Sequence, residues 1–302
     1  MVYTYYVFHI KIHNMKNNIV VKKNELAKIR YSLSLNEQRL LLACISKIDS
    51  RKSLDINHEF VITVQEFRDL FDDNHKNTYH NLKLASDKLF DRTFILKDFE
   101  GIEKFHWVKR VKYWHDDSKV RLVFSDEIIP YLTSITEKFF KYKLDDVKNF
   151  QSVYSLRFYE LLHQFQAGGR GAQEIEIDEL RLLLNLEDKY STFGELKRSV
   201  IDKAISEINQ HSNLFVSYGE RKRGKKVVAI QFSFEIKAAI KPLATVPVEK
   251  KSIVISSKSD NENERQLLIE QFATSRKRFG DAVNESNVPK HIVEILKNSG
   301  RW

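Results

Sequence analysis

The chain contains little cysteine, proline or glycine. Its 302 residues include one cysteine, Cys44, together with 4 prolines and 9 glycines. A single thiol forms neither an internal disulfide nor a cysteine metal site, so the sequence predicts a reducing, cytoplasmic setting. Few prolines and glycines are typical of a chain built from helices and hairpins with short loops.

Long apolar runs are also missing. No segment approaches the length of a membrane-spanning helix, which argues against a membrane protein. The first 16 residues hold a short apolar patch, but Lys11 and two histidines interrupt it and no small-residue cleavage site follows. A signal peptide is therefore not expected. Met15 is an alternative to Met1 as the native start.

Aromatic and basic residues are abundant instead. Hydrophobic residues make up 42% of the chain and aromatic residues 12%, which is enough for folded cores, and the length allows about two domains. The net charge is +9. This excess favours an acidic partner, either nucleic acid or an anionic membrane surface.

Residues 192–210 predict an amphipathic helix. Thr192 and Glu195 form a capping-box pattern at its start. An apolar stripe recurs at helical spacing, made of Leu196, Val200, Ala204, Ile205 and Ile208. The opposite face is polar and partly basic, with Arg198, Ser199, Asp202, Lys203, Ser206 and Asn209.

A cationic hairpin is predicted after this helix. Val228, Ile230, Phe232 and Phe234 alternate with polar residues, which is the period of a strand. The tip at 221–226 carries five positive charges in six residues: Arg221, Lys222, Arg223, Lys225 and Lys226. A helix followed by a basic finger is typical of the second half of a winged helix-turn-helix, and it suits a phosphate backbone beside a major groove. The alternative is a solvated turn beside an ordinary amphipathic helix.

The first half of the chain shows the same order of elements. Ser34 and Glu37 cap a helix at 35–48, a strand covers 58–63 and a short helix covers 64–71. A longer helix at 78–92 is expected to face inward with Tyr79, Leu82, Ala85, Leu89 and Phe90. A long hairpin is predicted at 105–124. In the second half, a helix at 152–166, a strand at 173–177 and a helix at 178–186 precede residue 192.

An internal repeat supports this comparison. Residues 60–71 align with 173–184 at a constant offset of 113 residues, so Ile62 matches Ile175 and Phe67 matches Leu180. A repeat of this size predicts two related domains. We therefore expect an α+β fold of two tandem winged-helix domains. The expected segments are an extension at 1–18, a first domain at 19–137, a second domain at 138–237 and a linker with a partly helical tail at 238–302.

Signatures of catalysis are absent from the sequence. Gly219, Gly224 and Lys225 resemble a phosphate-binding loop, but Lys226 stands where Ser or Thr is needed and two strands flank the segment. Tyr154 and Tyr159 are conceivable nicking nucleophiles, yet their helical spacing favours core packing. We therefore predict no enzyme activity, no cofactor and no metal.

Five segments are specific in combination: Val21–Leu26, Tyr31–Leu42, Tyr154–Leu162, Phe193–Arg198 and Glu207–Asn209. Together they resemble the iteron-type plasmid replication initiators related to the F-plasmid initiator, and the resemblance covers roughly residues 20–236. It is nearest in character to initiators of small Acinetobacter-type plasmids and similar small circular DNAs. It implies that the second domain contacts one end of each iteron, while the first contacts the other end and carries a dimer interface.

The same resemblance implies partners and site residues. Monomers would bind origin iterons and recruit host initiator, helicase and chaperones, and dimers would bind an operator inverted repeat and repress the chain's own gene. The second domain's contacts would be Lys197, Arg198, Ser199 and Lys203 on the helix and the finger residues at 221–226. The first domain's contacts would be His80, Lys83 and Lys88.

Three other interpretations remain open from the residues alone. A two-domain transcriptional repressor would use the same DNA-binding parts. A rolling-circle nickase lacks its His-hydrophobe-His motif here, since three residues separate His9 from His13. A membrane-surface protein would need an exposed amphipathic anchor. We further expect the edge of hairpin 105–124 to mediate dimerisation, so that deletion of residues 1–135 leaves a monomer.

Overall fold

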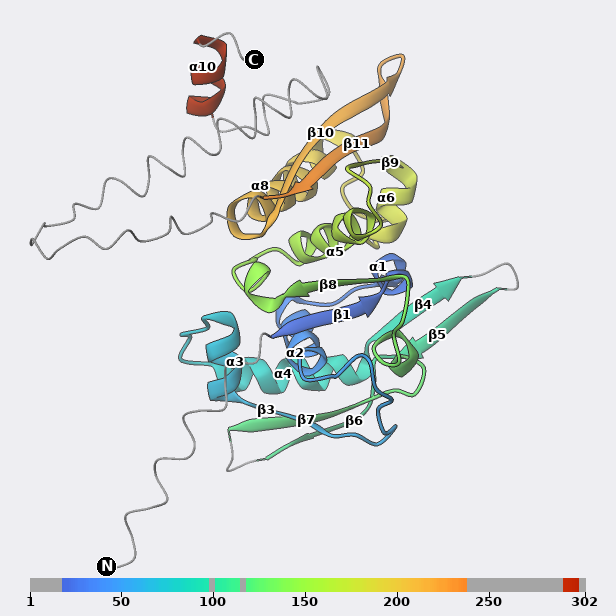
Figure 1. Ribbon diagram of the computed structural model, residues 1–302, viewed down its shortest axis with the longest axis vertical. Coiled ribbons are helices and arrows are strands. Elements are labelled where there is room, and N and C mark those ends of the chain that lie inside the picture. Colours follow the sequence, from blue (N-terminus) through green and yellow to red (C-terminus); the bar gives the residue numbers. More distant parts are fainter. Residues whose placement is uncertain (1–17, 98–100, 115–117, 238–289, 299–302) are drawn as a thin grey trace, which may run out of the picture. The chain divides into compact units, whose positions relative to one another are not determined.

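The computed structural model describes residues 18–97, 101–114, 118–237 and 290–298 (Figure 1). The chain divides into two compact units between Val153 and Tyr154. Most of the predicted extension 1–18, and residues 238–289 of the predicted linker and tail, lie outside the described residues. None of the helices within those ranges combines the length and apolar character needed to cross a bilayer.

The first unit alternates short strands with helices. Its elements are β1 (Ile19–Lys23), α1 (Asn24–Lys28), β2 (Arg30–Tyr31), α2 (Leu35–Ile45), β3 (Phe60–Thr63), α3 (Val64–Phe71), α4 (Thr78–Asp91), β4 (Thr93–Lys97), β5 (Ile102–His106), β6 (Val108–Tyr113), β7 (Lys119–Phe124), η1 (Ile129–Tyr131), β8 (Phe139–Lys143) and η2 (Leu144–Asp146). The strands form three antiparallel sheets, in the orders β3-β7-β6, β2-β4-β5 and β1-β8.

The second unit repeats the pattern with a longer hairpin. Its elements are α5 (Val153–Ala167), β9 (Ala172–Glu176), α6 (Ile177–Leu183), α7 (Phe193–Leu196), the π-helical turn η3 (Lys197–Ile201), α8 (Asp202–His211), β10 (Leu214–Arg223), β11 (Lys226–Ile236) and α10 (Lys290–Asn298). The central strand is β11, which pairs with β10 on one side and β9 on the other. The helix α10 lies within the predicted, partly helical tail.

The internal repeat is confirmed at the level of structure. In each unit a short strand, β3 or β9, leads directly into a short helix, α3 or α6, and pairs with the second strand of the following hairpin. The aligned residues are buried at both places: Ile62 and Ile175 in the strands, Phe67 and Leu180 in the helices. A shared apolar pattern therefore produces the same local fold twice.

The start of α2 is fixed by a capping box, as predicted. The backbone N–H of Glu37 donates to Ser34 Oγ at 3.3 Å, and the Ser34 N–H donates to Glu37 Oε2 at 3.0 Å. The buried Glu37 carboxylate also accepts from Arg92 Nε at 3.0 Å, just beyond the end of α4. One carboxylate therefore caps α2 and holds the C-terminal end of α4.

The hairpin expected at 105–124 is divided differently. Phe105 and His106 belong to β5, which pairs with β4, and Trp107 turns the chain into β6. The hairpin is β6 and β7, while β4 and β5 form a second hairpin in another sheet. The prediction that Phe90 faces inward was wrong: its side chain is 46% exposed. The error in the hairpin arises because an alternating apolar pattern does not show where one strand ends and the next begins. Phe90 follows the buried Leu89 directly on α4, and neighbouring helix positions face different directions.

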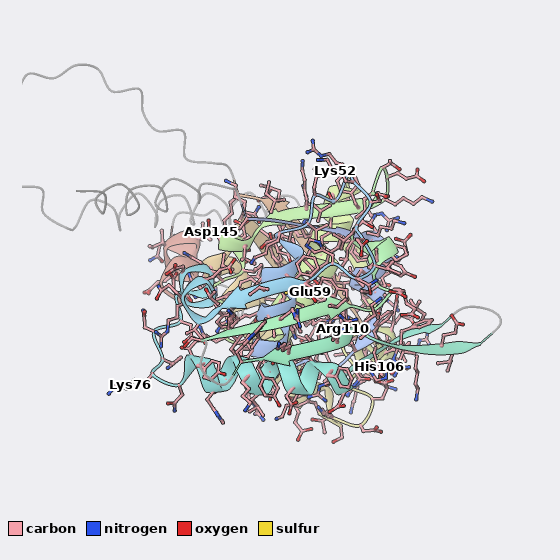
Figure 2. The ribbon with its side chains drawn as sticks, turned by 90° about the horizontal axis from the view of Figure 1, so that it is seen from below. Lys52, Glu59, Lys76, His106, Arg110 and Asp145 are labelled. Atoms are coloured by element: carbon pink, nitrogen blue, oxygen red, sulfur yellow. The ribbon has the colours of Figure 1, made fainter. Side chains whose placement is uncertain are left out.

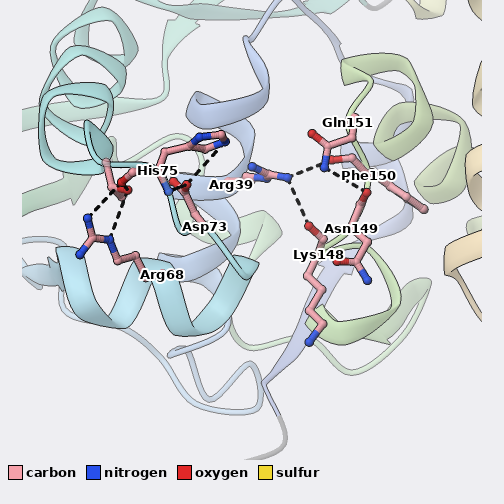
Figure 3. Close-up of polar contacts among 9 residues, drawn as sticks. Arg39, Arg68, Asp73, His75, Lys148, Asn149, Phe150 and Gln151 are labelled. Atoms are coloured by element: carbon pink, nitrogen blue, oxygen red, sulfur yellow. Dashed lines mark hydrogen bonds and ion pairs between the residues drawn. The ribbon is translucent and has the colours of Figure 1, made fainter.

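The predicted domain boundary at 137/138 lies before the division between the two units at Val153 and Tyr154. Residues 139–143 form β8, which pairs with β1 across all five positions. The segment beyond it is fixed on α2, where Arg39 Nη2 donates to the carbonyls of Lys148 at 3.3 Å and Phe150 at 3.0 Å (Figure 3). A hydrogen bond to Asp72 raises the pKa of Lys148. Pairing between segments far apart in the sequence therefore extends the first unit.

Candidate nucleic-acid interface

The predicted helix at 192–210 forms as the continuous run α7, η3 and α8. The expected capping box is present: Thr192 Oγ1 accepts from the Glu195 N–H at 3.2 Å, and Glu195 Oε2 accepts from the Thr192 N–H at 3.2 Å. Hydrogen bonds from Thr192 lower the pKa of Glu195, with a smaller contribution from the positive charge of Arg198. Between the two α-helical parts, Lys197–Ile201 take a π-helical turn, a feature often found at functional sites.

The apolar stripe of this helix is buried as predicted, and that burial sets the outer face. Leu196, Val200, Ala204 and Ile208 have no exposed side-chain surface. Arg198 and Lys203 are exposed on the opposite side, and Ser199 is half-buried. Asn209 connects the helix to β10. Its Nδ2 donates to the carbonyl of Val216, and its Oδ1 accepts from the N–H of Val216, both at 2.7 Å.

Lys197 is held within the second unit. Its ammonium lies 2.9 Å from Asp202 Oδ1 and 2.6 Å from the Tyr218 hydroxyl, and the Tyr218 hydroxyl donates to the same carboxylate. The ammonium also lies 5.1 Å from the centre of the Tyr218 ring. Lys197 therefore joins the π-helical turn to β10 through contacts within the unit.

Arg198 is left available by this arrangement. Asp202 lies four residues along the helix, at a spacing that would allow an ion pair with Arg198. Asp202 instead binds Lys197 and Tyr218. Within the described part of the chain, the exposed Arg198 guanidinium has no ion-pair or hydrogen-bond partner.

The cationic finger is the end of the β10–β11 hairpin. Gly224 has a φ of +63° at the first of two turn residues, which is the conformation that a tight hairpin turn needs and that glycine adopts without strain. Arg223, Lys225 and Lys226 are exposed around this turn and have no salt-bridge partner in the residues that the structure describes. Lys222 is exposed, and its Nζ lies 3.5 Å from Glu220 Oε2.

Arg221 differs from its neighbours. Its Nε donates to Glu174 Oε1 at 2.9 Å, and its Nη2 lies 3.6 Å from Glu176, both on β9. Gln231 on β11 donates to the other oxygen of Glu174 at 2.9 Å. Arg221 therefore forms ion pairs with two glutamates of β9. It lies at the bulge where the β10–β11 register shifts.

In the first unit, α4 occupies the place of this helix. His80 and Lys88 are exposed on α4, as a DNA contact requires. Lys83 is half-buried, with its ammonium 4.4 Å from the centre of the Tyr113 ring on β6. The exposed face of α4 also carries Asp87 and Leu84, so it is less basic than the face of Arg198 and Lys203.

The two helices are tied to their hairpins in corresponding ways. Buried positions 82, 85, 86 and 89 of α4 match 201, 204, 205 and 208 at a constant offset of 119 residues. With this offset Lys83 corresponds to Asp202. Lys83 contacts Tyr113 and Asp202 contacts Tyr218, and each tyrosine lies on the first strand of its hairpin. Asp202, Tyr218, Glu174 and Glu176 were not predicted as site residues, because no local pattern connects them to the basic residues that they hold.

Of the two tyrosines considered for strand cleavage, Tyr159 is buried and Tyr154 is half-buried. Tyr159 is buried and its hydroxyl donates to Asn213 Oδ1 at 2.9 Å. Burial raises the pKa of Tyr154 to about 12, with a further contribution from its hydrogen bond to Tyr190, which disfavours a phenolate nucleophile. The described residues contain no cluster of three or more His, Cys, Asp or Glu side chains that could hold a metal ion.

Comparisons with known proteins identify similar chains. Residues 19–163 match the family model described as "Initiator Replication protein, WH1", and residues 176–234 match "Initiator Rep protein, WH2". A replication initiation protein of Escherichia coli is 31% identical over 229 residues, which cover 74% of this chain and 71% of the relative. The PI protein of Escherichia coli is 24% identical over 255 residues, covering 73% of this chain and 84% of the relative.

A solved structure has the same fold. The crystal structure of the Pi initiator protein in complex with iteron DNA superposes with a TM-score of 0.65 at 22% sequence identity. The match covers 74% of this chain and 99% of that chain. Together with the two family models, this match confirms the predicted fold of two tandem winged-helix domains.

Proposed function

Because the chain belongs to the family of initiator replication proteins, we propose that it binds the iterons of a plasmid origin as duplex DNA and initiates replication there. The observation that carries this proposal lies in the second domain, where exposed Arg198 and Lys203 share a unit with the cationic hairpin end at 223–226. The helix suits a major groove and the hairpin suits the flanking phosphates. The protein acts by binding and needs no catalytic group of its own.

A replication assay tests the proposal. The gene and its adjacent direct repeats are placed on a plasmid that lacks any other origin, and transformants are counted. We expect stable maintenance with the intact gene and none with a frameshifted gene. Repeats that are bound tightly in vitro but do not support maintenance would identify the chain as a repressor instead.

We include self-association in the proposal. In the first domain, β5 is the outer strand of the sheet β2-β4-β5, and Ile102 on it is 59% exposed. An exposed outer strand has unpaired backbone groups that a second copy can pair with. A dimer formed through this edge, in equilibrium with the monomer, would bind an inverted repeat and repress the gene. Host initiator, helicase and chaperones remain the proposed partners of the DNA-bound monomer.

The hairpin end is expected to contact phosphates rather than bases. Replacing Arg223, Lys225 and Lys226 with glutamine should weaken binding to iteron and random duplex alike. The slope of log affinity against log salt should fall by up to about 2.7, at about 0.9 for each lost phosphate contact. Fluorescence anisotropy at several salt concentrations measures both effects.

Arg221→Gln is the comparison variant at the same hairpin. In the wild type, the Arg221 guanidinium is bound to Glu174 and Glu176. Its loss should therefore leave the slope of log affinity against log salt unchanged. A loss confined to iteron duplex in the triple variant would instead assign base contacts to the hairpin end.

A further inference from the structure

One face of the first domain's sheet β3-β7-β6 carries a concentration of positive charge. Arg110 and Lys112 lie on the outer strand β6, and Lys119 and Arg121 lie on β7. Lys112 is directly opposite Arg121 in the β6–β7 register. Arg110 Nη1 lies 3.8 Å from Glu59 Oε1, and Arg121 Nη1 lies 2.5 Å from Glu59 Oε2. The side chains therefore share one face, which Figure 2 shows with Glu59 and Arg110 labelled.

This face lies opposite the core of the domain. Val120 and Leu122 alternate with Lys119 and Arg121 along β7 and are fully buried, so the charged residues point to the other side. Arg110 and Lys112 are exposed. Lys119 and Arg121 are half-buried, so the face is open along its outer strand β6.

Three of the cations surround one indole. Lys112 Nζ lies 4.8 Å from the centre of the Trp114 ring, Lys119 Nζ lies 4.7 Å from it, and Arg121 Cζ lies 5.4 Å from it. An aromatic face attracts each cation, but the cations repel one another, and like charges directly opposite across strands are destabilising. Within the described part of the chain, Glu59 forms ion pairs with Arg110 and Arg121 on this face. An anion such as a phosphate would reduce the repulsion among the cations.

The sequence at the end of this hairpin suits phosphates poorly. Residues 115–117 lie outside the described residues, and they include Asp116 and Asp117. The second domain has the opposite sign there, with Arg223, Lys225 and Lys226 around Gly224. In the described part of the first domain, the positive charge of the hairpin lies along its side.

The charged strand β6 lies beside the helix that corresponds to the second domain's DNA-binding helix. The Tyr79 hydroxyl on α4 donates to the carbonyl of Trp114 at 2.5 Å, and Lys83 on α4 contacts the Tyr113 ring. A duplex lying along the exposed face of α4 therefore passes the end of β6.

We propose that the first domain contacts the phosphate backbone of the bound duplex with this open sheet face, through Arg110 and Lys112 on β6 and the cations around Trp114. Trp114 holds Lys112, Lys119 and Arg121 in one cluster, and Glu59 orients the two arginines. The inference rests on the proposed function, because it places a second set of contacts on the same duplex.

The test neutralises the two exposed cations of β6 in the full chain. Arg110→Gln with Lys112→Gln is expected to weaken binding to iteron and random duplex and to lower the salt slope by about 1.8, at about 0.9 for each contact. The matched control is Lys141→Gln with Lys143→Gln, which removes the same charge from exposed positions on β8. The control should leave the slope unchanged.

Neutral methylphosphonates placed singly along the iteron locate the contacts. We expect at least one position whose neutralisation weakens the wild-type complex but not that of the β6 double variant. Equal slopes for the wild type and the double variant, or the same loss in the control, would overturn the inference. A loss confined to single-stranded DNA would also overturn it. If the wild-type chain binds no repeat-containing duplex, the proposed function itself fails.

Discussion

Arg198→Lys is expected to cost about 1–3 kcal/mol of binding free energy on the iteron and to relax the preference at one base pair. Arginine can donate two parallel hydrogen bonds to guanine O6 and N7, and lysine cannot reproduce that planar fork. The substitution keeps the positive charge, so a contact to phosphate would lose little. Competition binding across a set of single-base iteron variants measures the preference.

The geometry favours Arg198 over its neighbours for this role. Lys197 is bound to Asp202 and Tyr218, so Asp202 does not pair with Arg198. Lys203 is exposed one turn further along the helix. Arg223→Lys at the hairpin end is the matched control, since the same substitution at a phosphate contact should leave the preference unchanged. If Arg198→Lys also keeps the preference, Lys203 becomes the next candidate for base contact.

Ile102→Lys is expected to weaken the proposed dimer at least tenfold, which corresponds to about 1.4 kcal/mol. The substitution removes a 59% exposed apolar side chain from the outer strand β5 and places like charges opposite each other in a paired edge. Sedimentation equilibrium over a range of protein concentrations measures the dissociation constant.

Ile56→Lys is the control for the dimer. Ile56 is 51% exposed, lies between α2 and β3, and receives the same chemical change away from any strand. It should associate like the wild type. A dimer equally stable in Ile102→Lys would exclude the β5 edge as the interface. These variants replace the deletion of residues 1–135, because β8 pairs with β1 and belongs to the first unit.

Local patterns predicted the parts of the site that depend on local geometry. The capping boxes at Ser34 and Thr192, the buried stripe from Leu196 to Ile208 and the turn at Gly224 all formed as expected. Each depends on residues within one helix or one hairpin. The repeat at an offset of 113 residues likewise predicted two related units.

The partners of the basic residues were not predictable in this way. Lys197 and Arg198 are adjacent in the sequence, and both looked like DNA contacts. The fold separates them, because the π-helical turn places Lys197 beside Tyr218, twenty-one residues later, while Arg198 points outward. Arg221 is likewise held by Glu174, forty-seven residues earlier.

Composition and spacing alone established a basic chain with two winged-helix domains and a cationic hairpin. They do so because helix and strand periods, caps and turns are set by neighbouring residues. Which positive charges are available to DNA was decided by the tertiary structure. The availability of a charge depends on whether a carboxylate or an aromatic ring from a distant strand lies beside it. Strand pairing and the packing of helices on strands bring such residues together. The open, cationic face around Trp114 arises in the same way, from β6 and β7 lying side by side.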